Sequence, residues 1–591
     1  MEVAGYSELV RTLLARRGVE KEEDIAAFLN PDYVAHTHDP FLLQGMKSAV
    51  ARVLAAMADG ERIAIYADFD CDGIPGAALL SDLFRKLEYE NFEVYLPHRD
   101  REGYGFHTAA IAALAARGVS LIITIDVGTN ATDAVRFAKE RGVDVIVTDH
   151  HEVTGPPAGG LPNAVAVLNP KIVPPALSGP VVSPSTALGT GSAEPVEGYP
   201  FPHLCGAAVA FKLAQALLIE GKCRGIENFV KVQDGWEKWL LDMVAIATIA
   251  DMVPLVGENR ALAHWGLAVL RKSPRPGIRA MCRKLRLAQQ ELTESDIGFS
   301  IAPRINAASR MDEPDLAFKL LTTADPIEAE ALVAKLEKLN ASRKGIVASV
   351  VRQARIHVDQ RFTAHERVVV LGNTDWKPAL LGLAANSIMG ERGGVVCLWG
   401  RDVNGNLKGS CRSDGSVSLT ELFANAGDVF EECGGHNASG GFTVSYEQVH
   451  NLPDALRAAA DGLPKEASGT SIREHDFLLT VPEVSHALLK DVSKLAPFGV
   501  GNPKPVFLFG GITITDVRRF GKENNHVEVM LECSRTGAKA RAFDFFKSPD
   551  DFSLCPAPGL AAGLLATVER DMFSARGRGG LALRIVDVIP A

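Results

Sequence analysis

The hydrophobic and polar positions between residues 62 and 170 follow two alternating patterns. Short apolar runs of strand type are separated by stretches whose apolar residues recur at helical spacing. The apolar runs predict strands at 62–67, 92–96, 120–126, 144–148 and 164–168, and the stretches between them predict helices at 77–87, 108–117 and 131–141. This alternation is typical of a parallel sheet that is covered by helices on both faces.

The remaining sequence predicts four further segments. Amphipathic patterns predict helices at 6–17, 21–29 and 46–57, a helical N-terminal segment that we expect to pack on the first domain. Residues 325–362 predict one long charged helix, and residues 367–424 repeat the strand and helix alternation on a smaller scale. The C-terminal part predicts a five-strand pattern compatible with an OB barrel, with strands at 505–515, 525–533, 538–546, 562–569 and 580–588.

The sequence therefore predicts an α/β protein with a parallel-sheet domain, a long connecting helix, a smaller α/β domain and a C-terminal all-β barrel. The expected boundaries are 1–60, 61–324, 325–362, 363–465 and 466–591. Residues 171–202 are rich in Pro, Ser, Gly and Thr and predict a surface loop without chemistry of its own.

Composition indicates an ordinary globular protein, with 47% hydrophobic and 23% charged residues. No apolar run approaches the length that crosses a bilayer, and the N-terminal residues lack the features of a signal peptide, so we expect a cytoplasmic protein without a membrane partner. The net charge of −10 means that a polyanion would need a local basic groove. The nine cysteines include no C-x-x-C pair, so we expect buried apolar roles for them.

Three aspartates at alternate positions, Asp68, Asp70 and Asp72, follow the first predicted strand. Ligands of open parallel sheets bind at the carboxyl ends of the strands. Three carboxylates this close repel one another unless a cation lies between them, and oxygen ligands favour magnesium or manganese. A calcium loop of the EF-hand type would need a preceding helix and a glutamate where Leu79 stands. A solvated acid-rich turn is the alternative that these residues alone leave open.

Two more predicted strands end in polar residues at the same edge. Asp126 follows the third strand, and Asp149, His150 and His151 follow the fourth. A single aspartate at a strand end is ordinarily a helix cap, and a single histidine is ordinarily a core residue. Three such strand ends at one edge favour a shared site.

Asp149-His150-His151 after a buried strand resembles the signature of the DHH phosphoesterase superfamily. Long motifs also resemble those of the RecJ-type single-strand-specific DNA exonucleases, in the order of that family, at residues 39–43, 204–213, 249–255, 301–310 and 495–503. The resemblance implies a metal-dependent 5′→3′ exonuclease that hydrolyses single-stranded DNA in repair and recombination. It also implies that residues 363–465 are a substrate-binding domain and that the barrel binds DNA.

Phosphodiester hydrolysis places negative charge on the attacking and leaving oxygens, and two divalent cations can stabilise both. Asp126, alone at its strand end, is the candidate bridge between two such ions. We expect Asp68 and Asp70 to complete one site. The other site is expected to hold Asp72, His150 and Asp251, where Asp251 matches the family's fourth metal-binding motif. The cations are Mn²⁺ or Mg²⁺, and an imidazole ligand favours manganese.

The remaining candidate residues would act on the substrate. Asp149 is expected to orient a histidine, and His151 to contact the scissile phosphate or protonate the leaving oxygen. Bidentate guanidinium groups suit phosphate, so we expect Arg304, Asn306 and Arg310 to hold the strand.

By resemblance, Arg99, Ser410 and Arg412 would form a pocket for the 5′-terminal phosphate, and Gly435 and His436 would bind substrate. In the barrel, phosphate contacts and base stacking are expected from Arg518, Arg519, Lys522, Arg541, Phe520, Phe543 and Phe545.

The chain departs from the family pattern at a few positions. Pro75 and Gly76 stand where the family usually has a Thr or Ser, and Lys377 where a His is common. Ser309 and Ser439 replace a usual Gly and Ala. None of these changes removes a predicted metal ligand.

Two other functions remain alternatives. One is a phosphodiesterase for short oligoribonucleotides or cyclic dinucleotides, and the other is a catalytically inactive replication scaffold of the same fold. The N-terminal helices and the barrel disfavour the first, and the intact acids and histidines disfavour the second. A single-strand-binding protein and a helicase are the expected protein partners.

Overall fold

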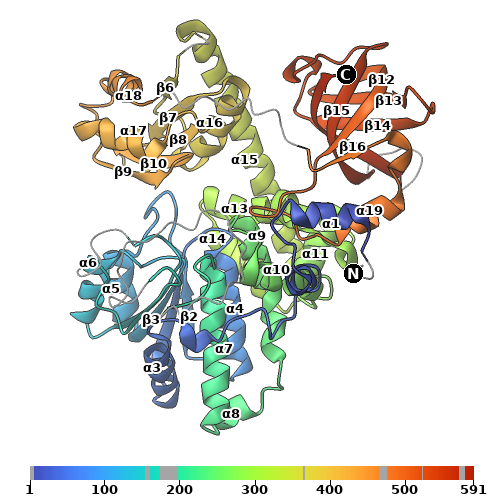
Figure 1. The fold of residues 1–591 in the computed structure, drawn as a ribbon. Helices are drawn as coiled ribbons and strands as arrows, with labels where there is room; N and C mark the ends of the chain where they lie inside the picture. The colour runs from blue at the N-terminus through green and yellow to red at the C-terminus, as the bar shows by residue number, and fades with distance from the viewer. Residues whose placement is uncertain are drawn as a thin grey trace.

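The computed structural model describes residues 6–153, 160–172, 198–363, 366–464, 475–521, 524–571 and 580–591. Two sheet domains and a barrel are arranged around a long helix, α15 (Pro326–Arg361), which extends from the first domain to the second (Figure 1). Among the described residues, no helix combines the length and the apolar character needed to span a membrane. Most of the predicted loop at 171–202 lies outside the described residues.

The first domain contains a five-stranded sheet in the order β2-β1-β3-β4-β5, in which every pairing is parallel. Its strands are β1 (Arg62–Ala67), β2 (Phe92–Tyr95), β3 (Val119–Ile125), β4 (Asp144–Thr148) and β5 (Ala166–Leu168). The helices between the first four strands are α4 (Gly73–Lys86), α5 (Thr108–Ala116) and α6 (Thr132–Lys139). The predicted parallel sheet is confirmed, within a few residues at each end.

Helices cover both faces of this sheet because its buried strands are apolar on both sides. Ile63 and Ile65 face a core shared with α3 (Met46–Ala58), α4 and α7 (Gly206–Cys223). Ala64 and Tyr66 face a second core with α5 and α6. The first core continues through α8 (Glu227–Val230), α9 (Leu241–Ala250), α10 (Gly257–Leu270), α11 (Pro276–Leu285), a π-helical turn (Ile297–Ile301), α13 (Ala302–Arg310) and α14 (Pro314–Thr322). The short α12 (Glu294–Asp296) directly precedes the π-helical turn.

The smaller α/β domain has a mixed sheet in the order β6-β7-β8-β10-β9. Its elements are β6 (Val368–Gly372), α16 (Pro378–Arg392), β7 (Val395–Arg401), β8 (Leu407–Ser413), α17 (Leu419–Asn425), β9 (Glu432–His436), β10 (Ser439–Val444) and α18 (Leu452–Asp461). The sequence assigned no element to residues 408–413 or 433–441. They form β8 and the β9–β10 hairpin because glycines allow close pairing there.

Cysteine roles differ from the prediction at several positions. Cys397 and Cys411 form a disulfide, since the antiparallel register of β7 and β8 places them directly opposite each other. The free cysteines Cys223, Cys433 and Cys555 are exposed rather than buried. The prediction of a small buried residue holds for Cys71, Cys205, Cys282 and Cys533.

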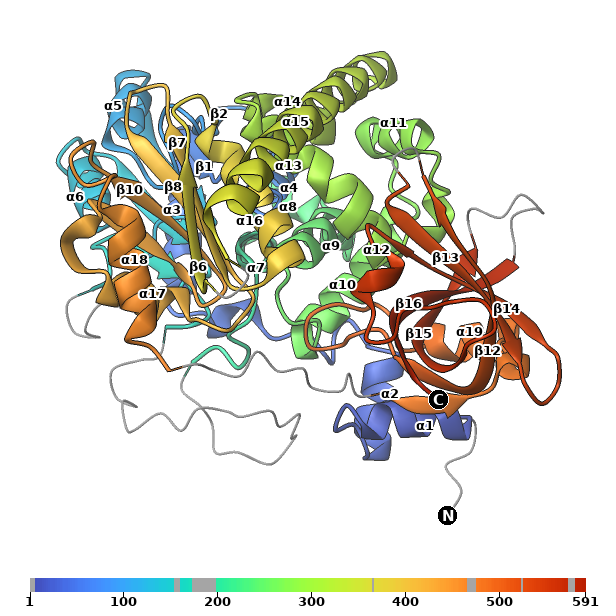
Figure 2. The ribbon, with the colours of Figure 1, turned by 90° about the horizontal axis from the view of Figure 1, so that it is seen from above.

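The C-terminal domain is a barrel, and the pairing of β12 with β15 closes its six-strand sheet (Figure 2). Its elements are β11 (Phe477–Leu479), α19 (His486–Ser493), β12 (Phe507–Phe520), β13 (His526–Cys533), β14 (Lys539–Phe545), β15 (Ala561–Asp571) and β16 (Gly580–Pro590). The predicted OB-type barrel is confirmed, and the short β11 is an additional strand.

The N-terminal helices are divided between two domains, which corrects the expectation that they pack together on the first one. Helices α1 (Glu8–Ala15) and α2 (Glu22–Leu29) share a hydrophobic core with the barrel domain. Arg17 donates through Nε to the Asn502 side chain at 2.9 Å. In Figure 1, α1 lies beside α19. Only α3 joins the core of the first domain.

Candidate metal centre

Three acids lie at one edge of the first sheet because the backbone ladder continues one residue past the strands. The amide of Asp68 donates to the carbonyl of Ile125 at 3.0 Å, and the amide of Asp126 donates to the carbonyl of Thr148 at 2.9 Å. The amide of Asp149 donates to the carbonyl of Leu168 at 3.0 Å. The carboxylates therefore emerge side by side at the carboxyl edge.

Asp126 has an unusual backbone conformation. Its φ is 61°, in the left-handed region that residues other than glycine rarely adopt, and only 4% of the residue is exposed. Gly206 lies against it, because a Cβ on this glycine would be 2.6 Å from the Cβ of Asp126. The sequence pattern gave no sign that Gly206 lies against a predicted metal ligand.

Two helix N-termini hold the acid-rich turn after β1. Asp70 Oδ1 accepts the amides of Asp72 at 2.8 Å and Gly73 at 3.2 Å, at the start of α4. Asp72 accepts the amides of Gly206 at 2.6 Å and Ala207 at 2.8 Å, at the start of α7. These contacts fix two of the three carboxylates before any ligand binds.

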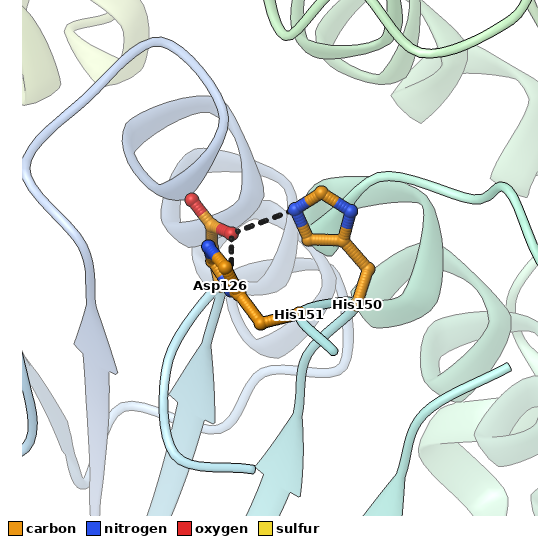
Figure 3. Close-up of side chains that lie close together, drawn as sticks. All are labelled: Asp126, His150 and His151. Atoms are coloured by element: carbon orange, nitrogen blue, oxygen red, sulfur yellow. Dashed lines mark ion pairs between the residues drawn. The ribbon is translucent and has the colours of Figure 1, made fainter. Parts of the chain in front are cut away.

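The polar atoms at this edge form three overlapping groups, and within each the potential ligand atoms all lie within 4.8 Å of one another. The groups are Asp68, Asp70 and Asp126; Asp72, His150 and Asp251; and Asp126, His150 and His151. Nε2 of His150 lies 3.2 Å from Asp126 Oδ1, 3.6 Å from Asp251 Oδ2 and 3.7 Å from Asp72 Oδ2. Figure 3 shows the Asp126 carboxylate directed at both histidine rings. All of the residues predicted as metal ligands therefore meet in one place.

Burial and mutual repulsion dominate the electrostatics of the acids. Burial, followed by the neighbouring carboxylates, raises the pKa of Asp126 and Asp68 well above the usual range. The same two causes raise the pKa of Asp72 to about 7 and that of Asp251 to about 9. Burial and the nearby His151 lower the pKa of His150 to about 3. Neutral imidazole is therefore favoured at His150, whereas at His151 the contact with Asp149 and the charges of the neighbouring acids outweigh burial and raise the pKa.

The donor set fits divalent cations. Among the described residues, the buried atoms Asp68 Oδ1 and Asp126 Oδ1 have no hydrogen-bond partner, although buried carboxylate oxygens are ordinarily paired. A hard cation bound by carboxylates and one imidazole would satisfy these oxygens and relieve the repulsion.

His151 is held by two neighbours. Its Nδ1 lies 2.7 Å from Asp149 Oδ1, and Asp149 Oδ2 accepts the amide of Thr129 at 2.8 Å. Burial alone would raise the pKa of Asp149, but the hydrogen bond and the charge of His151 lower it well below its usual range. The Tyr104 hydroxyl lies 3.2 Å from His151 Nδ1 and donates to the Asp126 carbonyl at 3.3 Å. Tyr104 is not among the predicted site residues, and its one local signal in the sequence is the pair of glycines that flanks it.

A cluster of arginines adjoins the acids. Arg99 lies over the Phe69 ring at 5.0 Å, and Arg310 donates to the carbonyl of Ala379 at 2.8 Å. Burial and the cations Arg99, Arg343 and Arg412 lower the pKa of Arg310 to about 9. In the part of the chain that the structure describes, Arg99, Arg310 and Arg412 have no carboxylate within ion-pair distance. Such a cluster favours an anion.

Ser410 and Arg412 lie on β8 against α16. A Cβ on Gly382 would lie 2.5 Å from Arg412 Nη2 and 3.4 Å from Ser410 Oγ. Arg412 also donates to the carbonyl of Cys411 at 2.7 Å. The small size of Gly382 therefore leaves room for both side chains beside α16.

Other predicted substrate residues have protein partners in the structure. Arg304 pairs with Glu337 of α15 and donates to the carbonyl of Ser300 at 2.7 Å. The Asn306 side chain accepts the amide of Cys71 at 2.9 Å, so it supports the acid-rich turn. Gly435 and His436 are exposed on β9, and the charge of His436 is among those that lower the pKa of His150.

The barrel arginines are largely neutralised by acids. Arg518 and Arg541 both pair with Glu528, and Arg541 also lies 2.7 Å from Asp571. Arg519 lies 3.9 Å from Asp550. Lys522 is outside the described residues. The predicted aromatic residues do gather: the rings of Phe520, Phe543 and Phe545 contact one another or His526.

Comparison with known proteins places each domain in a family. The DHH family, N-terminal domain, matches residues 62–248; the DHHA1 domain matches 365–462; and the RecJ OB domain matches 475–583. The single-stranded-DNA-specific exonuclease RecJ of Bacillus subtilis is 34% identical over 88% of this chain, and the chain spans 61% of that protein's length.

Two further similarities extend over most of both chains. The single-stranded-DNA-specific exonuclease RecJ of Haemophilus influenzae is 30% identical, with 89% of this chain and 86% of that protein covered. The crystal structure of RecJ in complex with Mn²⁺ from Thermus thermophilus has a TM-score of 0.76 and 25% identity, covering 99% of this chain and 76% of that one.

Proposed function

The chain belongs to the family of RecJ single-stranded-DNA-specific exonucleases, and from this premise we propose that it is a metal-dependent nuclease that hydrolyses single-stranded DNA from the 5′ end. The observation that carries the proposal is the meeting of five carboxylates and two imidazoles at one sheet edge, beside arginines that have no carboxylate partner among the described residues. The acids suit cations and the arginines suit a phosphate, as phosphodiester hydrolysis requires.

We assign two divalent cations to the acid groups. Asp68, Asp70 and Asp126 would hold one, and Asp72, His150 and Asp251 the other. Asp126 is the candidate bridge because its carboxylate also approaches His150. Bound cations of this kind stabilise charge on the attacking and leaving oxygens and supply hydroxide at neutral pH. The nitrogen ligand His150 favours manganese over magnesium.

The other residues at this edge would orient the substrate. Asp149 holds Nδ1 of His151, which directs Nε2 to the scissile phosphate or to the leaving oxygen. Tyr104 contacts the same imidazole and keeps it from turning away. Asn306 supports the acid-rich turn by accepting the Cys71 amide, and its side-chain amino group would donate to the strand.

The preference for one DNA end would come from the arginine cluster. Arg99, Ser410 and Arg412 form the proposed pocket for a 5′-terminal phosphate, because guanidinium groups bind phosphate bidentately. Arg310 would contact the next phosphate. Gly435 and His436 on the exposed β9 would cover the bound strand, and Arg304 would reach it only after releasing Glu337.

The barrel and the expected protein partners would deliver the DNA strand to the metal centre. The aromatic cluster of the barrel would stack on bases of the incoming strand. A single-strand-binding protein and a helicase would present that strand, and the cytoplasm would be the compartment. The domain boundaries 1–60, 61–324, 325–362, 363–465 and 466–591 remain proposed functional divisions, although α1 and α2 pack on the barrel.

The test is cleavage of a single-stranded oligonucleotide that carries a label at its 5′ or its 3′ end, with manganese and with EDTA. We expect manganese-dependent release of mononucleotides from the 5′ end only, and no cleavage by an Asp126→Asn control. Degradation of short oligoribonucleotides alone would instead indicate the small-substrate phosphodiesterase. Binding of DNA without any cleavage would indicate the inactive scaffold.

A further inference from the structure

The segment between β2 and α5 brings two site residues to the metal centre. It carries Arg99, which lies over the Phe69 ring, and Tyr104, which contacts His151. The segment forms neither a strand nor a helix, and the amide of Glu102 donates to the carbonyl of His98 at 2.8 Å in a turn, so side-chain contacts with neighbouring elements also help to fix its path. Its position therefore determines where Arg99 meets the proposed 5′-phosphate pocket.

Side chains of the first domain hold one side of the segment. Asp312 Oδ1 lies 3.2 Å from His98 Nδ1, and Asp312 Oδ2 lies 3.1 Å from Arg101 Nε. Glu102 accepts the hydroxyl of Tyr95 at 2.6 Å. The residues that flank Arg99 are thus tied to the loop between α13 and α14 and to β2.

The smaller domain holds the other side of the same segment. Lys377 Nζ lies 2.7 Å from Asp100 Oδ2, and the Asn404 side chain donates to the carbonyl of Arg101 at 3.0 Å. The Asp100 side chain is 8% exposed and that of Lys377 is 30% exposed, so water screens this ion pair only in part. The residue next to Arg99 is therefore fastened to a different domain.

Lys377 occupies a specific place in that domain. It is the N-cap residue of α16, the helix whose Gly382 accommodates Arg412 and Ser410. The ion pair consequently joins the two halves of the proposed pocket, with Arg99 on one side and Ser410 and Arg412 on the other.

Like charges around the pocket oppose a close approach of the two domains. Arg99 and Arg412 each lower the pKa of Arg310, which shows that the three cations repel one another across the domain boundary. Repulsion favours separation of the two domains, and an attractive pair beside it opposes that separation.

We propose that the Asp100–Lys377 ion pair is a latch that sets the position of Arg99 relative to Ser410 and Arg412, and so determines how strongly a 5′-terminal phosphate is held. Lys377 is a positioning residue in this role, since it acts through Arg99 and not on the substrate. The inference rests on the proposed function and deepens it.

The test compares steady-state cleavage of oligonucleotides with a 5′-phosphate and with a 5′-hydroxyl. For Lys377→Met we expect KM for the phosphorylated strand to rise about tenfold, the effect of losing one good charged contact, while kcat changes less than about twofold. KM for the 5′-hydroxyl strand should hardly change. The exchange Asp100→Lys with Lys377→Asp should restore most of the loss, and Asp100→Asn should reproduce it.

Glu391→Gln is the matched control, because it removes an ion pair of the same α16 with Arg355 that lies away from the domain boundary. An unchanged ratio of the two KM values in Lys377→Met, or a charge exchange that restores nothing, would overturn the latch. Failure of the unmodified chain to cleave either strand would instead overturn the proposed function. The affinity of Lys377→Met for manganese, measured by titration, should equal that of the unmodified chain.

Discussion

The amide of Gly206 donates to Asp72 Oδ2 at 2.6 Å, while a Cβ on the same glycine would lie 2.6 Å from the Cβ of Asp126. One residue at the start of α7 therefore fixes one carboxylate by a hydrogen bond and lets a second approach by having no side chain. These two carboxylates belong to different groups of potential metal ligands.

Gly206→Ala should lower cleavage by about 100-fold, because an approach below 3.0 Å forces α7 or Asp126 to shift, and small displacements of catalytic groups have effects of this order. Gly345→Ala is the control, since nothing lies within 4 Å of its added Cβ on α15. Manganese affinity, measured by calorimetry, should fall with activity in Gly206→Ala. Full activity in this variant would show that the site tolerates a wider separation between α7 and Asp126.

Asp126→Asn should abolish cleavage and greatly weaken manganese binding. Asp126 belongs to two of the groups of potential metal ligands, and the uncharged amide is a poorer ligand in each. In EDTA the same variant should unfold at a higher temperature than the unmodified chain, since burial and neighbouring acids disfavour a charge at this position. Manganese should raise the unfolding temperature of the unmodified chain more than that of the variant. Equal manganese stabilisation of both proteins would remove Asp126 from the ligand set.

The residue pattern predicted the sheet and its edge because both depend on local information. Strand periodicity gives β1, β3 and β4, and the parallel order then brings Asp68, Asp126 and Asp149 to one edge. The exact ion pairs could not be predicted in the same way. Arg304 pairs with Glu337 on another helix. Two barrel arginines, on β12 and β14, pair with Glu528 on the strand between them, β13. The neutralisation of these arginines therefore depends on tertiary packing.

The same limit applies to Gly206 and to the N-terminal helices. Gly206 looks like an ordinary helical residue in the sequence, because its neighbour Asp126 is distant along the chain. Helices α1 and α2 are amphipathic, and this pattern shows that they pack but not on which domain. Their true partner, the barrel core, follows more than 400 residues later.

Removal of one partner of a buried ion pair should strongly destabilise the chain. Lys212 Nζ lies 2.5 Å from Glu258 Oε1 and donates to the carbonyl of His38, and Glu258 also accepts the hydroxyl of Tyr199 at 2.7 Å. Both charged side chains are fully buried. Glu258→Gln or Lys212→Met should each destabilise the chain by about 3–5 kcal/mol. Each replacement removes one charge of the pair and leaves the other charge buried without a counter-charge.

Denaturant unfolding measures this effect, and the double replacement Lys212→Met with Glu258→Leu is the informative comparison. It leaves neither charge buried, so it should be less destabilising than either single change. A double variant as unstable as the sum of the single variants would mean that the network contributes through its hydrogen bonds to His38 and Tyr199 instead.

Arg412→Gln should remove the preference for a phosphorylated 5′ end while leaving the metal centre intact. Arg412 lacks a carboxylate partner among the described residues and lies with Arg99 beside the acids, so a phosphate dianion is its best available counter-charge. The glutamine keeps a polar side chain of similar length but cannot form a charged bidentate contact. We expect kcat/KM for a 5′-phosphorylated strand to fall by about 10- to 100-fold, towards that of a 5′-hydroxyl strand.

Competition between the two strands in one reaction gives the ratio of their kcat/KM values directly. Arg518→Gln in the barrel, where the arginine pairs with Glu528, should leave this ratio unchanged. A preference that survives Arg412→Gln would place the 5′-phosphate elsewhere in the arginine cluster, with Arg310 as the next position to replace.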